Sequence, residues 1–270
     1  MYQDQGKLKQ AEEYLHKALN ITYELFDENR PLIANYCNTL ALIYQSQGKL
    51  EEAAEQSKKS LNLTHELFGD NHPSVARYYA TLALIYQSQG KLEHAVEYST
   101  KALAIDCKLF GDNHPEAARS YRDLGAIYLD QGKLGQAAKY SIRALTIYHK
   151  FYGKNNPRAA ITCNNLGQIY QNYGNLAKAV EYSTRALAIN LKLFGKNHPQ
   201  VAVCCNNLGR IYQQQGNFDK AFEHMSKALK LSYRLYGENH HKVIKSCNDL
   251  MALFLEVYSK QSGQKNNFLG

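Results

Sequence analysis

The chain has 270 residues, of which 44% are hydrophobic and 21% charged, and its formal net charge is +8. This composition is typical of a soluble protein of one or two domains, and no apolar run approaches the roughly 20 residues that a membrane span needs. The first ten residues lack the apolar core of a signal peptide, so we expect a cytoplasmic protein without membrane insertion. The basic excess alone does not choose among acidic peptides, nucleic acid and anionic membranes as partners.

The dominant pattern is a strict repeat. One glycine recurs every 42 residues from Gly6 to Gly216, a second recurs at the same interval from Gly69 to Gly237, and all five prolines form a third series from Pro31 to Pro199. A period of this length indicates a stacked array of supersecondary units.

The chain opens within a unit. Met1 to Gly6 align with Ile43 to Gly48, so we expect residues 1–30 to be an incomplete first unit: the last turn of one helix, then a complete partner helix near 7–26. Full units are expected at 31–72, 73–114, 115–156, 157–198 and 199–240.

Each full unit predicts two helices. From Pro73 to a stop near Gly90, apolar or small residues follow helical spacing, and proline suits a first helical turn while glycine suits the end. A second helix is expected from near Lys91 to Phe110, before Gly111. Small residues at Ala95, Ser99 and Ala102 would let the neighbouring helix approach closely.

The joint between units carries the phrase LFGDNHP at 67–73 and 109–115, LFGKNHP at 193–199 and FYGKNNP at 151–157. The recurring histidines His72, His114, His198 and His240 lie in different units, too far apart to share a metal ion with ligand distances of about 2 Å. We expect them to serve in turns or helix caps, and we expect no metal site and no cofactor.

Beyond the last unit, 241–260 is expected to be a capping helix and 261–270 a disordered tail. The cysteines Cys37, Cys163, Cys205 and Cys247 share one register with Tyr79 and Tyr121. A position that alternates between cysteine and tyrosine is filled by packing, so reduced, buried cysteines are expected rather than disulfides.

These residues resemble the tetratricopeptide repeat. Its pattern of Leu, Gly/Ala, Tyr, Ala and Ala appears at Leu82, Ala83, Tyr86, Ala95 and Ala102 and recurs in the following units. The period of 42 in place of 34, the G-x-x-H-P joints and the NNLG first helices are similar to the kinesin light chain class of these repeats. The resemblance covers residues 1 to about 256 and implies an all-α, right-handed α-solenoid. It does not include the heptad segment by which a kinesin light chain holds its heavy chain.

No motif for catalysis is present. The chain has no phosphate-binding G-x-x-x-x-G-K-[ST], no H-E-x-x-H, no C-x-x-C and no G-x-S-x-G. Cys204 and Cys205 lie beside each other, but Cys205 belongs to the packing register and no histidine lies at a plausible base position. We therefore expect a protein that is not an enzyme.

The first-helix registers that vary from unit to unit are free to contact a partner. In tetratricopeptide repeat proteins such positions line the inner groove, and the resemblance therefore assigns these residues to it: Asn38, Arg77, Arg119, Arg122, Asn164, Asn165, Gln168, Asn206, Asn207, Arg210, Lys245 and Asn248. Asparagine can pair with a partner's backbone amides and arginine can hold a carboxylate. Asp123 and Asp249 lie in the same registers and reduce the positive field.

The leading hypothesis is an adaptor whose groove holds an extended, acidic or carboxylate-bearing segment of a protein partner. The alternative is a self-associating scaffold that assembles through its solenoid ends. Nucleic-acid binding is the third hypothesis. It is not expected, because Tyr44, Tyr86, Tyr128, Tyr170 and Tyr212 are committed to the packing stripe.

Overall fold

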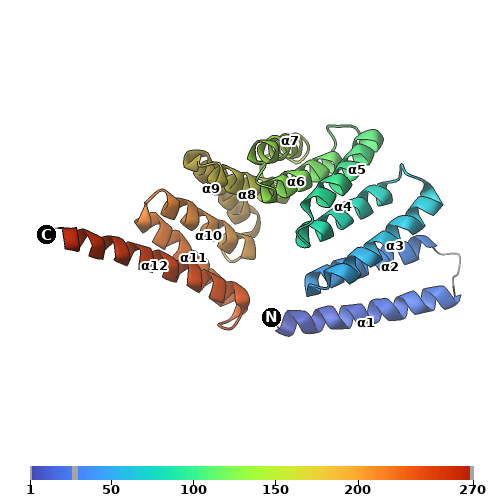
Figure 1. Cartoon of the computed structure of the whole chain (residues 1–270), viewed down its shortest axis with the longest axis horizontal. Helices are drawn as coiled ribbons and strands as arrows, with labels where there is room; N and C mark the ends of the chain where they lie inside the picture. The colour runs from blue at the N-terminus through green and yellow to red at the C-terminus, as the bar shows by residue number, and fades with distance from the viewer. Residues whose placement is uncertain (1, 26–29, 268–270) are drawn as a thin grey trace. The chain divides into compact units, whose positions relative to one another are not determined.

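The computed structural model describes residues 2–25 and 30–267, with side chains at 7–24 and 30–260. Those residues form helices and contain no strand (Figure 1). The helices are α1 (Tyr2–Leu25), α2 (Arg30–Gln47), α3 (Leu50–Phe68), α4 (Pro73–Ser88), α5 (Leu92–Phe110), α6 (Pro115–Asp130), α7 (Leu134–Tyr152), α8 (Pro157–Asn172), α9 (Leu176–Phe194), α10 (Pro199–Gln214), α11 (Phe218–Tyr236) and α12 (His241–Asn267).

The helices pair along the chain, which confirms an all-α solenoid of helix hairpins. Helix α2 packs on α3, α4 on α5, α8 on α9 and α10 on α11, and first helices of consecutive hairpins also touch, as α2 does α4 and α8 does α10. The chain divides into two compact units, an N-terminal unit of residues 1–147 and a C-terminal unit of 148–270, with the boundary inside α7.

The joint phrase builds the start of each first helix. His72 accepts a hydrogen bond at Nδ1 from the backbone N–H of Ser74, and Pro73 is the first residue of helix α4. The ring of Phe68, at the end of α3, stacks on His72 with centroids 4.2 Å apart. Gly111 ends α5 with φ of 89°, a conformation that side chains disfavour. The predicted capping role of the histidines is therefore confirmed.

The same cap recurs in the other joints. In His114, His198 and His240 the ring Nδ1 accepts a hydrogen bond from the backbone N–H of the residue two positions later, which is Glu116, Gln200 and Lys242 respectively. In the joint at 151–157 Asn156 takes the place of histidine, and its Oδ1 accepts a hydrogen bond from the backbone N–H of Ala159 at 2.8 Å. Histidine and asparagine are thus interchangeable as acceptors at this position.

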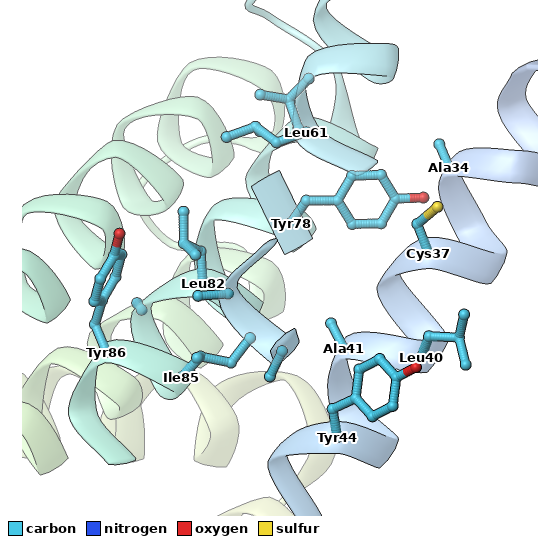
Figure 2. Packing of buried hydrophobic residues seen from close by; sticks show 14 of the residues in the cluster. Ala34, Cys37, Leu40, Ala41, Tyr44, Leu61, Tyr78, Leu82, Ile85 and Tyr86 are labelled. Atoms are coloured by element: carbon cyan, nitrogen blue, oxygen red, sulfur yellow. The ribbon is translucent and has the colours of Figure 1, made fainter. Parts of the chain in front are cut away.

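The core of the N-terminal unit lies between its paired helices. Figure 2 shows the Tyr78 ring reaching from α4 to α2, where its hydroxyl lies beside Ala34 and Cys37. That hydroxyl donates to Asn35 Oδ1 at 2.7 Å, so the large buried ring leaves no unpaired polar group. The small residues fit as predicted, since Ala95 and Ser99 are buried against the neighbouring helix.

Two helix boundaries differ from the prediction. Helix α1 runs through residue 6 without the expected turn, because continuing a helix adds a hydrogen bond with each residue whereas starting a new one is costly. Helix α12 continues to Asn267, so the expected tail over 261–267 is helical. Lys260 pairs with Glu256 one turn earlier at 2.7 Å and no proline follows. Residue 1 and residues 268–270 lie outside the described part.

All six cysteines are free. Cys37, Cys163 and Cys205 are buried in the packing register as predicted, whereas Cys247, in the same register of α12, is exposed, so the prediction of a buried cysteine is wrong there. In the described ranges 2–25 and 30–267, no helix is long and apolar enough to cross a membrane.

Candidate functional site

The twelve candidate residues all lie on first helices of the hairpins. Asn38, Arg77, Arg119 and Arg122 belong to α2, α4 and α6 of the N-terminal unit, and the remaining eight belong to α8, α10 and α12 of the C-terminal unit.

First helices within a unit are joined by side-chain hydrogen bonds across their polar edges. In the N-terminal unit Gln45 donates to Ser88 Oγ at 2.9 Å and Gln87 donates to Asp130 at 2.5 Å. In the C-terminal unit Gln213 donates to Glu256 at 2.7 Å. Each bond joins residues one repeat plus one position apart, so the polar registers of successive first helices lie side by side.

The three N-terminal arginines differ in what they contact. Arg119 lies 3.6 Å from Asp106 and 3.3 Å from Glu116, and Arg122 lies 2.7 Å from Asp123. Arg77 is exposed and donates to Ser74 Oγ at 3.4 Å, and its guanidinium lies 5.8 Å from the Tyr78 ring centre. Arg77 thus has no acidic partner among the described residues, whereas Arg119 and Arg122 are already held by carboxylates.

Arg77 and Arg119 share the wall of one pocket of about 570 Å³. The other lining residues are Pro73, Asp106, Phe110, His114 and Glu116. Asp106 is 1% exposed and accepts a hydrogen bond from Ser120 Oγ at 2.7 Å. Burial raises the pKa of this carboxyl above its ordinary value.

Sequence reasoning missed Asp106, although a signal was present. The same second-helix register holds Thr64, Tyr148 and Asn190, and Asp106 is the one acid in that set. All four are buried. An acidic residue in a register that the other units fill with uncharged residues is therefore the feature that could have identified it.

In the C-terminal unit two of the predicted asparagines are hydrogen-bonded to each other, and a third is hydrogen-bonded to an aspartate. Asn207 donates through Nδ2 to Asn164 Oδ1 at 2.8 Å, and Asn206 donates to Asp249 at 2.7 Å. Asn165 and Gln168 are half-buried and make no side-chain hydrogen bond within the described residues. Asn38, by contrast, is 8% exposed on α2 of the N-terminal unit and little of it faces solvent.

The remaining candidates face solvent. Arg210 lines a polar hollow of about 740 Å³ together with Gln171, Gln214, Glu256 and Lys260. Asn248 lines another hollow of about 850 Å³, and Lys245 is exposed on the same helix. Neither Arg210 nor Lys245 makes an ion pair within the described residues.

The neighbouring cysteines have the chemistry of packed residues. Burial raises the pKa of Cys205 to about 11 and also raises the pKa of Cys204, so both thiols are protonated at pH 7. Among the side chains at 7–24 and 30–260, no cluster of three or more His, Cys, Asp or Glu residues could hold a metal ion.

Comparison with known proteins places these features in a family. The tetratricopeptide repeat model matches residues 1–64, 36–108, 101–150, 116–192, 158–234 and 205–255. No curated protein sequence matches.

Solved structures give the same result. BtubC (BKLC) from P. vanneervenii is similar with a TM-score of 0.72 and 23% identity, over 87% of this chain and 94% of that one. A putative kinesin light chain with nearly identical TPR-like repeats from Podospora anserina is similar with a TM-score of 0.64 and 25% identity, over 78% and 100%. PilF from Pseudomonas aeruginosa matches at 0.55 and 21%, over 90% and 100%. The chain belongs to the tetratricopeptide repeat family, and its repeats are of the kinesin light chain-like class.

Proposed function

We propose that this protein is a non-catalytic adaptor that holds an extended, acidic or carboxylate-bearing segment of a protein partner on the polar faces of its first helices. Members of the tetratricopeptide repeat family generally mediate interactions between proteins. The observation that carries the proposal for this chain is the hydrogen-bonded pair Asn164–Asn207.

This pair is suited to a peptide backbone. Their mutual bond uses Oδ1 of Asn164 and Nδ2 of Asn207, so Nδ2 of Asn164 and Oδ1 of Asn207 remain as one donor and one acceptor. An extended peptide presents alternating C=O and N–H groups along its length. Two fixed amides with complementary free groups can therefore pair with a backbone whatever side chains it carries, as in other modes of extended-peptide recognition.

The proposed preference for acidic segments rests on the basic side chains that have no acidic partner within the described residues. Arg77 in the N-terminal unit, and Arg210 and Lys245 in the C-terminal unit, are exposed. Arg119 and Arg122 are paired with carboxylates, so a ligand would have to compete for them. Each unit thus offers its own unpaired cation to a carboxylate, and arginine can bind it through two parallel hydrogen bonds.

We place this adaptor in the cytoplasm. Six unpaired cysteines, one of them the exposed Cys247, suit a reducing compartment, where disulfides are rare.

The test begins with a displayed peptide library selected on the immobilised full chain. We expect enrichment of acidic peptides without a fixed spacing of side chains. The best peptide, labelled with fluorescein, is then titrated against the protein and two variants at several salt concentrations. Arg210→Glu should weaken binding about tenfold, which corresponds to about 1.4 kcal/mol, and flatten the salt dependence. Asn164→Ala should weaken binding at all salt concentrations.

Lys192→Glu is the matched control, since Lys192 is also exposed but lies on the second helix α9. It should bind as the wild type does. Selection of basic or charge-free peptides, or equal losses for Arg210→Glu and Lys192→Glu, would contradict the proposal.

A second candidate function, self-association, is favoured by one observation on α12. Five large apolar side chains spaced along this helix are more than half exposed: Ile244, Met251, Phe254, Leu255 and Tyr258. A face of this kind commonly marks an interaction site.

A further inference from the structure

The C-terminal unit contains a pocket that none of the candidate residues lines. It lies among α9, α10 and α11 and has a volume of about 430 Å³. Its apolar lining consists of Leu187, Leu191, Val201, Cys205 and Leu231, of which Val201 and Cys205 are buried. It is therefore separate from the polar faces of the first helices.

Comparison with other repeats of the chain explains why this space is open. In the N-terminal unit, the residue at the Cys205 register is Tyr79, whose ring stacks on Tyr98 with centroids 5.8 Å apart. In the next repeat Tyr121 stacks on Tyr140 at 5.9 Å. The pocket has Cys205 and His224 at these two registers. With a thiol and an imidazole in place of the two phenol rings, the stack that fills this position in those two repeats is missing, and the His224 ring stacks on Tyr212 instead, with centroids 5.5 Å apart.

The joint beside the pocket carries a cation where two joints of the N-terminal unit carry an acid. In those two joints Asp70 lies 2.8 Å from His65, and Asp112 pairs with Tyr121 and Arg143, whereas the joint of the preceding repeat has Lys154. At the pocket the corresponding residue is Lys196. The acid that would neutralise nearby cations is thus replaced by another cation.

The rim therefore has an excess of positive charge. It contains Lys196, Lys227, Lys230 and Arg234. Lys227 is paired with the exposed Glu223 at 2.5 Å, and Arg234 donates to the neutral Asn197 at 3.1 Å. Lys196 and Lys230 have no acidic partner within the described residues.

The other two titratable side chains of the lining, Cys205 and His224, are in contrast uncharged at neutral pH. Burial raises the pKa of Cys205 to about 11 and lowers the pKa of His224. A protonated thiol and a neutral imidazole among leucines favour an apolar occupant. The pocket thus joins an apolar interior to a cationic rim.

We propose that this pocket binds an amphipathic anion, whose apolar ring or chain fills the space of the missing tyrosine stack and whose carboxylate or sulfonate meets Lys196 and Lys230. The volume lies within the range of about 300–1,000 Å³ that small-molecule sites occupy. The same chemistry is offered by a free aromatic or aliphatic acid and by the terminal carboxylate of a protein that ends in an apolar residue.

The test uses two fluorescent probes of one shape and different charge. These are anilinonaphthalene sulfonate and its uncharged analogue N-phenyl-1-naphthylamine. The chain has no tryptophan, so protein fluorescence interferes little with either. We expect one saturable sulfonate site on the full chain. Cys205→Tyr, which restores the residue of two other repeats, should weaken both probes at least tenfold.

Lys196→Asp, which introduces the acid that Asp70 and Asp112 supply in their joints, should weaken the sulfonate several-fold and leave the uncharged probe unchanged. Lys196 is exposed, so this variant keeps the test valid even where Cys205→Tyr does not fold. Arg210→Glu, the variant used for the first-helix surface, should change neither probe, which separates this proposal from the adaptor function.

Competition identifies the source of the anion. Naphthaleneacetate should displace the sulfonate; displacement also by a peptide ending in phenylalanine, but not by its amidated form, would identify a protein terminus as the ligand. Unchanged affinity of both probes in folded Cys205→Tyr, equal loss of both in Lys196→Asp, or failure of every competitor would overturn the proposal.

Discussion

At the scale of single residues, the buried register between consecutive hairpins shows how polar groups are accommodated. Asp106 accepts from Ser120 at 2.7 Å, and in the same register of a later repeat Asn190 Nδ2 lies 3.3 Å from Cys204 Sγ. Asp106 and Asn190 are both nearly fully buried. Because each buried group has a partner one helix away, the register tolerates polar residues at modest cost.

Asp106 leads to a prediction about pH. Its pKa is raised by burial above the ordinary value of 3.8, so the folded state binds this proton more tightly than the unfolded chain does. This contribution to the free energy of unfolding is complete below about pH 3.8 and is lost as the pH rises through the raised pKa. Asp106→Asn should therefore increase the free energy of unfolding at pH 7, on the order of 1 kcal/mol, and reduce the decline between about pH 4 and 7.

Urea unfolding across that pH range measures both effects. Asp112→Asn is the control of opposite sign, because hydrogen bonds from Tyr121 and Arg143 lower the pKa of Asp112. Identical pH profiles for wild type and Asp106→Asn would show that the raised pKa does not contribute to stability.

At the scale of helices, the joint shows how a short recurring phrase starts each first helix. A ring nitrogen or an amide oxygen accepts one of the N–H groups that the first turn leaves unpaired. His198 also stacks on Phe194, at the end of the preceding helix, with centroids 4.2 Å apart. Cap and stack together connect the end of one hairpin to the start of the next.

His198→Ala should destabilise the start of α10 by about 1 kcal/mol, because the cap is lost. His198→Asn should retain most of that stability, because Asn156 caps α8 in the equivalent position. Hydrogen exchange of the first turn of α10 measures the difference. Equal exchange rates in the two variants would mean that the stack on Phe194, and not the cap, holds the joint.

At the scale of the whole molecule, contacts run between neighbouring hairpins within two compact units. In such an array each helix pair is covered by the next. The exposed apolar face of α12 departs from that cover, since Phe254 is 63% and Tyr258 65% exposed.

The self-association candidate predicts that the mass measured by light scattering rises with protein concentration. Phe254→Glu should abolish this rise, because burying an unpaired charge in an interface is costly. Phe222→Glu, at an aromatic residue that is 53% exposed on α11, serves as the control and should associate as the wild type does. A constant monomer mass for all three proteins would remove this candidate.

The period, the helix pairs, the glycine stops and the caps can all be predicted from the amino-acid sequence. These are local features: Gly111, Pro115 and His114 act through the conformation and hydrogen bonds of residues a few positions away, so a repeated spacing is enough to predict them. The twelve-residue surface was reached through family resemblance, and its role in binding stays a prediction.

Which of those side chains have partners becomes clear only from the packing of the helices. Arg119 meets Asp106, and Asn207 meets Asn164 43 residues away, and no local pattern specifies such pairs. The pocket at Cys205 likewise depends on what three helices leave unfilled. Burial and pairing depend on residues that are distant along the chain and become neighbours only when the hairpins pack.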